Sequence, residues 1–286
     1  MALTIVPTIT ELRTRLGPAR AEGRTVGFVP TMGYLHDGHL SLVEAARSTT
    51  DVVVVSIFVN PLQFAANEDL GAYPRDLDAD VARCEAAGVD LVFAPSVDEM
   101  YPVGEVATTV TVGGVSEVLE GASRPTHFAG VATVVAKLFS IVGTCSAFFG
   151  EKDFQQLAVV RRMAADLSLA VDVVGCPIVR EPDGLAMSSR NVYLDPDERA
   201  VAPVLQRALQ AGRALIESGE RDPAVVEAAM RELVEAEPLP ELDYLVAVDA
   251  ATLRRPEVLS GEVRLLGAMR LGRPRLIDNV GVTIPS

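Results

Sequence analysis

Short apolar runs alternate with amphipathic stretches along the first part of the chain. The β-branched run at 51–59, DVVVVSIFV, predicts a strand buried on both faces, as in a parallel sheet. Other strands are predicted at 25–29 (closed by Pro30), 89–94, 146–149 and 171–175, and helices at 40–47, 76–87, 130–142 and 153–167. This alternation indicates βαβ units and an α/β fold with a Rossmann-like, doubly wound parallel sheet.

The pattern changes near residue 180. A polar stretch at 180–191 leads to Asp195, Pro196 and Glu198, which suit the N-cap, N1 and N3 positions of a long helix. A second helix is predicted to open at Asp222-Pro223, and strands follow at 242–248, 263–269 and 276–280. Two helices followed by three strands indicate a smaller C-terminal α+β domain. We therefore expect two domains, at 1–178 and 179–286.

The amino-acid composition disfavours some classes of binding partner. Acidic residues outnumber basic ones 39 to 25, and the net charge of -14 opposes binding to nucleic acid or to anionic lipid. No apolar run reaches the ~18 residues of a membrane-spanning helix, and the first residues do not resemble a signal peptide. The three cysteines have no C-x-x-C spacing, which favours a reducing compartment. A cytoplasmic location is expected.

The strongest candidate site is the segment PTMGYLHDGH at 30–39, where a predicted strand turns into a helix. Parallel strands bind ligands at their carboxyl ends, and a helix N-terminus there attracts phosphate. His36 and His39 are three residues apart and share a helix face, with the small Gly38 between them. Two imidazoles can donate hydrogen bonds to charge developing at an α-phosphate. A capped helix with two surface histidines, or a metal site, would also fit this spacing alone.

Other nucleotide motifs are missing from the sequence. It contains neither G-x-x-x-x-G-K-[ST] nor G-x-G-x-x-G, so neither a P-loop nor a nicotinamide cofactor is indicated.

The string HDGH at 36–39 resembles the HIGH-type motif of the nucleotidyltransferase superfamily. The longer PTMGYLHDGHLSLV resembles one member, the pantothenate synthetase (pantoate–β-alanine ligase) family, and five further blocks agree in order: IFVNPLQF, YPR, RPTHFAGV, FFGEKDFQQL and DGLAMSSRN. The resemblance implies that ATP drives ligation of pantoate to β-alanine through a pantoyl adenylate, releasing AMP and pyrophosphate. It also implies a homodimer. The loop at 183–191 is polar, carries Gly184 and lies at the expected domain boundary, so we expect it to close over the triphosphate with the second domain as a lid.

The resemblance assigns roles to individual residues. The catalytic set is His36, His39 and Lys152. The ATP-binding set is Pro30, Thr31, Met32, Gly33, His36, Gly38, His39, Gly150, Glu151, Lys152, Asp153, Val179, Met187, Ser188, Ser189 and Arg190. The substrate-binding set is Gln63 (pantoate and β-alanine) and Gln156 (pantoate). Arg124 and His127 are added from their place before a predicted helix: we expect them to line the substrate entrance, with helix entry as the alternative role.

Two assignments are less definite in the sequence itself. Met32, Val134, Val135 and Phe149 could form an apolar wall against the pantoate methyl groups, but these residues suit an ordinary hydrophobic core equally well. For Mg²⁺ the family uses an acidic stretch matching 76–80, and Asp80 is the candidate here, but Ala79 interrupts the acidic pair and leaves the metal ligands open. ATP phosphates and water would then hold most of the cation.

Two other functions fit parts of the sequence. One is a cytidylyl- or adenylyltransferase that stops at nucleotide transfer, which the GEKDFQQ block and the two glutamines disfavour. The other is a nucleotide-binding module without catalysis, which the intact histidines, Lys152 and Ser188–Arg190 disfavour.

Overall fold

The computed structural model describes residues 3–64, 70–71, 73–104 and 106–285. The chain divides into two compact units: Met1–Glu151 with Gln155–Pro177, and Lys152–Phe154 with Ile178–Ser286. Among the described residues, no helix is long and apolar enough to cross a membrane.

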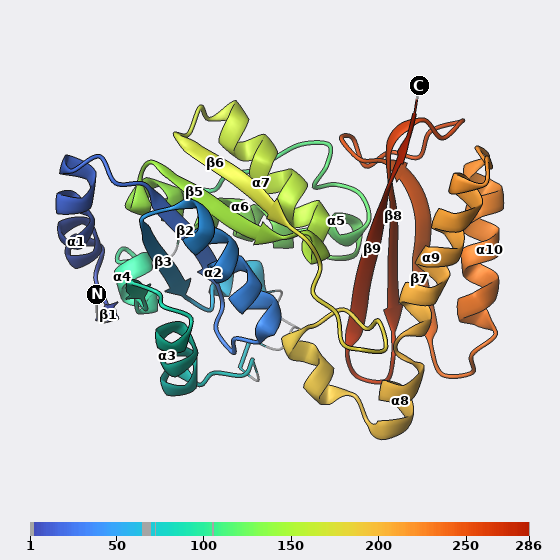
Figure 1. Cartoon of the computed structure of the whole chain (residues 1–286), viewed down its shortest axis with the longest axis horizontal. Helices are drawn as coiled ribbons and strands as arrows, with labels where there is room; N and C mark the ends of the chain where they lie inside the picture. Colours follow the sequence, from blue (N-terminus) through green and yellow to red (C-terminus); the bar gives the residue numbers. More distant parts are fainter. Residues whose placement is uncertain (1–2, 65–69, 72, 105, 286) are drawn as a thin grey trace. The chain divides into compact units, whose positions relative to one another are not determined.

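The first unit is built on a six-stranded parallel sheet in the order β1-β4-β3-β2-β5-β6 (Figure 1). Its strands are β1 (Thr4–Val6), β2 (Val26–Thr31), β3 (Val52–Ile57), β4 (Leu91–Phe93), β5 (Cys145–Gly150) and β6 (Val171–Cys176). From β2 the chain proceeds to β3 and β4 on one side, and β5 and β6 follow on the other. The strand order therefore reverses between the neighbours β2 and β5, and such a switch point is where open α/β sheets bind ligands.

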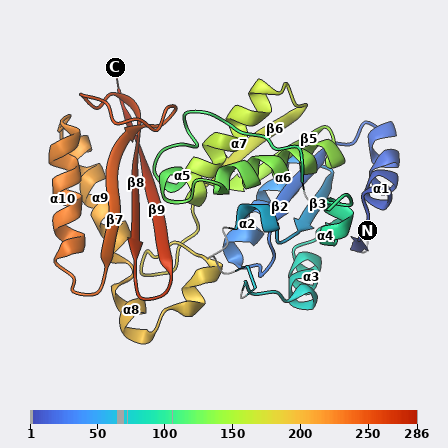
Figure 2. The same cartoon turned by 180° about the vertical axis from the view of Figure 1, so that it is seen from behind.

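Helices cover both faces of this sheet. The bounds are α1 (Ile9–Ala21), α2 (Asp37–Thr49), α3 (Leu77–Ala86), α4 (Val97–Met100), α5 (Glu120–Ser123), α6 (His127–Val142) and α7 (Phe154–Asp166), with short 3₁₀ turns η1 (Pro61–Gln63) and η2 (Glu151–Asp153). Val53 and Val55 of β3 join the core on the side of α2 and α3, whereas Val52 and Val54 join the core formed with α1, α6 and α7. Figure 1 shows α2 in front of the sheet and Figure 2, from behind, shows α6 in front. The predicted doubly wound fold is confirmed.

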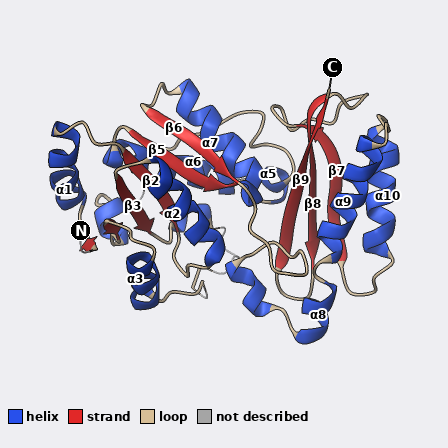
Figure 3. Ribbon diagram, viewed as in Figure 1, coloured by secondary structure: helices blue, strands red, loops and turns tan. Residues whose placement is uncertain are grey.

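The second unit is an antiparallel sheet covered by two helices (Figure 3). The sheet has the order β7 (Glu241–Asp249), β8 (Gly261–Arg270), β9 (Arg275–Ile284), and the helices are α9 (Val204–Glu217) and α10 (Pro223–Glu235). A short helix, α8 (Pro196–Val201), and a 3₁₀ turn, η3 (Ser189–Tyr193), precede them. The apolar faces of the two helices and of the sheet form one core, which includes Leu209, Met230, Leu245 and Leu265.

Two predicted boundaries at prolines were wrong. The single long helix expected from Asp195 is broken into α8 and α9 at Pro203, because proline has no N–H to continue the helical ladder. The strand expected to close at Pro30 continues to Thr31, with Pro30 opposite Ser56. In that stretch only β3 pairs with β2, since β5 pairs with β2 only at Gly27 and Phe28.

Candidate functional site

His36 and His39 lie at the start of α2, where the chain leaves β2. His36 is the N-cap: its Nδ1 accepts a hydrogen bond from the Gly38 N–H at 3.2 Å, and the His36 N–H donates to His39 Nδ1 at 3.3 Å. The two rings lie 4.1 Å apart between centroids. A neutral imidazole that accepts at Nδ1 carries its proton on Nε2. The helix cap therefore gives both histidines an Nε2–H donor, as a site for developing negative charge requires.

Residues 32–36, here named the histidine loop, connect β2 to α2. The Gly33 N–H donates to Thr31 Oγ1 at 3.2 Å, and the N–H groups of Tyr34 and Leu35 donate to the Asp80 carboxylate. Gly33 has φ 84° and Tyr34 φ 53°, which are left-handed conformations. The N–H groups of Gly33, Tyr34 and Leu35 thus all have hydrogen-bond partners inside the protein.

Asp80 was the candidate magnesium ligand, and its surroundings differ from that expectation. The side chain is buried, both carboxylate oxygens accept backbone N–H groups, and desolvation raises the pKa of the carboxyl above its ordinary value. Across the described residues, no group of three or more His, Cys, Asp or Glu side chains is arranged to hold a metal ion. Both Asp80 oxygens are thus engaged by backbone N–H groups.

Gln63 ends the 3₁₀ turn η1, just beyond β3, and Asn60 orients its amide. The buried Asn60 accepts at Oδ1 from the Leu62 N–H and from the Tyr101 hydroxyl, so its Nδ2 faces the other way and donates to Gln63 Oε1 at 3.2 Å. Gln63 Oε1 is thereby an acceptor, and its Nε2 points to the sulfur of Met32 at 2.8 Å. Gln63 consequently presents N–H donors toward Met32.

Arg124 and His127, predicted at the substrate entrance, contact Gln63. The Arg124 guanidinium donates to the Gln63 carbonyl oxygen at 3.3 Å, and His127 Nδ1 lies 3.0 Å from the same oxygen. Arg124 is the C-cap of α5 and His127 is the first residue of α6, as the alternative role of helix entry predicts. The structure thus brings three of the four predicted substrate residues together.

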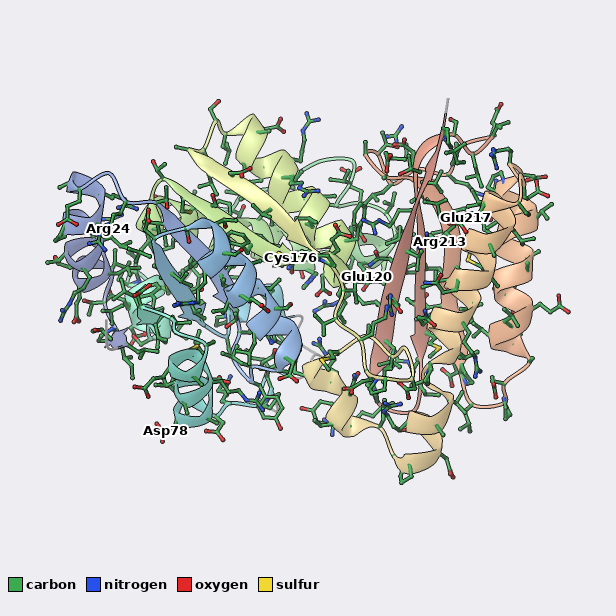
Figure 4. The ribbon with its side chains drawn as sticks, in the orientation of Figure 1. Arg24, Asp78, Glu120, Cys176, Arg213 and Glu217 are labelled. Atoms are coloured by element: carbon green, nitrogen blue, oxygen red, sulfur yellow. The ribbon has the colours of Figure 1, made fainter. Side chains whose placement is uncertain are left out.

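Two adjacent glutamines after β5, Gln155 and Gln156, have different surroundings. Gly150 ends the strand, which pairs with β2, and Glu151 opens η2. Gln155 is buried and spans the 115–120 segment: it donates to the carbonyls of Val115 and Val118 and accepts from the N–H of Glu120. Glu120 is labelled in Figure 4. Gln155 is therefore structural, whereas the neighbouring Gln156 is only half-buried.

In the second unit, β9 holds the residues around Lys152. The Asn279 amide donates to the Lys152 carbonyl at 3.0 Å, and the Arg264 guanidinium lies 3.8 Å from the centroid of the Phe154 ring. The Lys152 ammonium is 3.6 Å from the Asp153 carboxylate. Contacts from β8 and β9 thus hold the backbone and the Phe154 ring of this segment.

The stretch 179–191 is a tight hairpin followed by η3. The Met187 N–H donates to the Val179 carbonyl at 3.0 Å, and Gly184 occupies a left-handed turn with φ 95°. Arg180 anchors the hairpin to β9 by two hydrogen bonds to the buried Asp278 carboxylate, at 2.6 and 2.9 Å. The adjacent residues Asp278 and Asn279 therefore hold both predicted triphosphate-binding segments of this unit.

The η3 turn carries the predicted phosphate-binding hydroxyls. Ser188 caps it by accepting the Arg190 N–H at 3.2 Å, and its hydroxyl proton can still donate to another acceptor. Ser189 and Arg190 form the first turn of η3.

The proposed apolar wall is mostly core. Val134, Val135 and Phe149 are each 5% exposed and pack in the core on the α6 side, whereas Met32 is half-buried beside the Gln63 amide. Of these four residues, Met32 alone contacts a predicted substrate residue in the described contacts.

A family model, pantoate–β-alanine ligase, matches residues 4–281. The chain belongs to the pantoate–β-alanine ligase family. A pantothenate synthetase from Heliobacterium modesticaldum is 56% identical over 282 residues, which cover 99% of this chain and 100% of that protein. One from Roseiflexus sp. is 54% identical over 277 residues, 97% and 98% of the two chains.

Solved structures of the family have the same fold. Pantothenate synthetase from Thermus thermophilus matches with a TM-score of 0.92 and 53% identity, covering 96% of this chain and 98% of that one. The pantoate–β-alanine ligase of Francisella tularensis, solved with βγ ATP and β-alanine, matches with a TM-score of 0.80 and 32% identity over 98% and 97%. The predicted family and its ligase class are confirmed.

Proposed function

We propose that the protein condenses pantoate with β-alanine to form pantothenate, using ATP as a substrate and releasing AMP and pyrophosphate. Family membership supports the overall reaction. The observation that carries the mechanism is the pairing of His36 and His39, whose Nδ1 atoms both accept backbone N–H groups and leave the Nε2–H groups as donors. Such donors suit the α-phosphate of a nucleotide under attack.

In the first step, an oxygen of the pantoate carboxylate attacks the α-phosphorus of ATP. The bond from that phosphorus to the bridging oxygen breaks, and pyrophosphate departs with the bond electrons. The Nε2–H groups of His36 and His39 stabilise charge on the α-phosphate oxygens. We assign the β- and γ-phosphates to Lys152, Ser188, Ser189 and Arg190, so that the second unit acts as a lid during this step.

In the second step, the β-alanine amine attacks the acyl carbon of pantoyl adenylate. AMP leaves with the electrons of the acyl–oxygen bond, and the new amide nitrogen releases a proton to solvent. Gln63, whose amide oxygen is occupied by Asn60, would donate N–H groups to pantoate and to the β-alanine carboxylate. Gln156 would hold the pantoate hydroxyls. Alignment of amine and adenylate supplies several kcal/mol of the barrier reduction, as proximity generally does.

We assign Mg²⁺ to the triphosphate of the incoming ATP, where it would neutralise phosphate charge. The remaining ATP contacts are proposed for Pro30, Thr31, Met32, Gly33, Gly38, Gly150, Glu151, Asp153, Val179 and Met187. A homodimer and a cytoplasmic location are further proposals that follow the resemblance.

Pyrophosphate–ATP exchange tests this function directly. We expect exchange with ATP and pantoate alone, and pantothenate with AMP only when β-alanine is added. Exchange without pantoate would instead indicate a nucleotidyltransferase that acts on another acceptor. ATP binding with neither exchange nor product would indicate a nucleotide-binding module.

A further inference from the structure

Asp80 of α3 is a buried carboxylate that contacts the histidine loop. Asp80 is only 3% exposed, and its carboxylate contacts Leu35, which lies 45 residues earlier in the chain. One oxygen accepts the Tyr34 N–H at 2.8 Å and the other accepts the Leu35 N–H at 2.7 Å. The two hydrogen bonds use one carboxylate oxygen each, so both oxygens are needed as acceptors.

The loop has the backbone shape that this carboxylate requires. Successive residues with unusual backbone angles can turn their N–H groups toward one point and form a concavity for an anion. Gly33 and Tyr34 have positive φ, and left-handed backbone is unfavourable for a residue with a side chain, such as tyrosine. A Cβ atom added at Gly33 would lie 2.8 Å from an Asp80 oxygen. The anion in this concavity is therefore supplied by the protein itself.

The position of the histidine loop determines the positions of the two histidines. Leu35, held by Asp80, is followed directly by His36, whose N–H donates to His39 Nδ1 at 3.3 Å. His36 Nδ1 in turn accepts the Gly38 N–H. A shift of the loop would alter both hydrogen bonds and with them the tautomer and direction of each ring.

We propose that Asp80 is a positioning residue, which fixes the histidine loop and thereby aims the Nε2–H groups of His36 and His39 at the α-phosphate. The inference rests on the proposed function for its catalytic consequence, although not for its geometry. A carboxylate suits this position because its oxygens are both acceptors, whereas an amide would turn an NH₂ group toward one of the two N–H donors.

The test compares Asp80→Asn with Glu85→Gln, an exposed change on the same helix. We expect Asp80→Asn to lower the maximal rate of pantoate-dependent pyrophosphate–ATP exchange by about 10- to 100-fold, as a small misplacement of catalytic groups does. The KM for ATP should change by no more than about three-fold, because the same donors are less engaged in the ground state. The loss should be the same at low and saturating Mg²⁺, and Glu85→Gln should behave as wild type.

Imidazole nitrogen NMR provides a readout that does not depend on turnover. The chain has three histidines, so the signals of His36 and His39 can be assigned by single substitutions. We expect both to be Nε2–H tautomers in the wild type and in Glu85→Gln, and to become tautomer mixtures in Asp80→Asn. Protected amide protons at Tyr34 and Leu35 in the wild type are a further expectation.

Each outcome decides the inference. The inference would be overturned if folded Asp80→Asn kept the wild-type histidine tautomers and the wild-type rate of pyrophosphate–ATP exchange. It would also be overturned if high Mg²⁺ restored a lowered rate, since Asp80 would then be a metal ligand. If Asp80→Asn does not fold, Gly33→Ala disturbs the same contact from the loop side and must reproduce the tautomer change. Rapid hydrogen exchange of the Tyr34 and Leu35 amides in the wild type would also refute the inference. A wild type that lacks exchange yet shows the Asp80-dependent tautomers would remove the proposed function and leave the positioning role intact.

Discussion

His127 Nδ1 lies 3.0 Å from the backbone carbonyl oxygen of Gln63, so a residue at the start of α6 holds the turn that carries a predicted substrate ligand. We expect His127→Ala to raise the KM for pantoate by roughly five-fold, equivalent to the ~1 kcal/mol of a lost hydrogen bond. The KM for ATP should stay unchanged. His127→Gln is the matched control, since its amide N–H can donate to the same oxygen. A raised KM for ATP alone would contradict this role.

The Tyr101 hydroxyl contacts Asn60 Oδ1 at 2.8 Å and helps to fix the amide that orients Gln63. Tyr101→Phe leaves the ring in place but removes this donor, so the KM values for pantoate and β-alanine should rise by about three- to ten-fold. Steady-state kinetics with each substrate varied would measure the effect. Tyr244→Phe, in the second unit, controls for the loss of a tyrosine hydroxyl. Equal behaviour of the two variants would remove Tyr101 from the site.

His39→Ala tests the donor role of the paired imidazoles. Removing a positioned donor should slow adenylate formation by roughly two to four orders of magnitude. ATP binding, measured by calorimetry in the absence of pantoate, should weaken far less because the donor acts mainly on charge formed during the reaction. Pyrophosphate–ATP exchange near the wild-type rate would be incompatible with this role.

Ser188 and Ser189 test the assignment of the second unit to the triphosphate. The double substitution Ser188→Ala, Ser189→Ala should slow adenylation, since two hydroxyl donors to the leaving pyrophosphate are lost. Attack of β-alanine on preformed pantoyl adenylate involves no pyrophosphate and should keep its rate. Rapid-quench measurements of the two half-reactions separate these cases. Normal adenylation would remove these serines, and the lid role built on them, from the mechanism.

The cysteines predict how stability depends on pH. Burial raises the pKa of the Cys84 and Cys145 thiols to about 12, whereas an unfolded thiol titrates near ~8.5. Above about pH 9 the unfolded chain loses these protons and the folded chain keeps them, so each thiol lowers the free energy of unfolding by about 1.4 kcal/mol per pH unit. The contribution is complete below the unfolded pKa and is lost as pH rises.

Urea unfolding at several pH values measures this slope. Cys84→Ala, Cys145→Ala should flatten it, and an unaltered slope would contradict the assignment. Disulfide reagents should react with native protein far more slowly than with unfolded protein at about pH 8, because the thiolate is the reactive form.

The sequence predicted the parts of the site that are local in the chain. The strand-to-helix turn at His36, the turn after Gly150 and the hairpin segment with its serines each follow from short-range patterns. The start of α1 could also have been found from Thr8, the N-cap, whose side chain accepts the Glu11 N–H, but Gly17 and Pro18 interrupt the helical periodicity. Pro18 nevertheless lies inside this helix.

The contacts that orient the site join residues far apart in sequence. Asp80 with Leu35, Asn60 with Tyr101 and Arg180 with Asp278 are separated by 45, 41 and 98 residues. For Asp80, the family resemblance suggested a metal ligand from the position of the residue in the sequence alone. Its true partners depend on how strands and helices pack, which no short pattern contains.

Lys152–Phe154 count with the second unit although the residues on either side count with the first. The backbone therefore passes from one unit to the other three times, after Glu151, Phe154 and Pro177. Cutting the chain once at Pro177 would not yield two complete bodies: residues 178–286 would lack the carbonyl that Asn279 binds and the ring that Arg264 covers. To keep these contacts, an isolated second unit must be made as a fusion that includes residues 152–154. Any circular permutation must preserve the three passages of the backbone between the units.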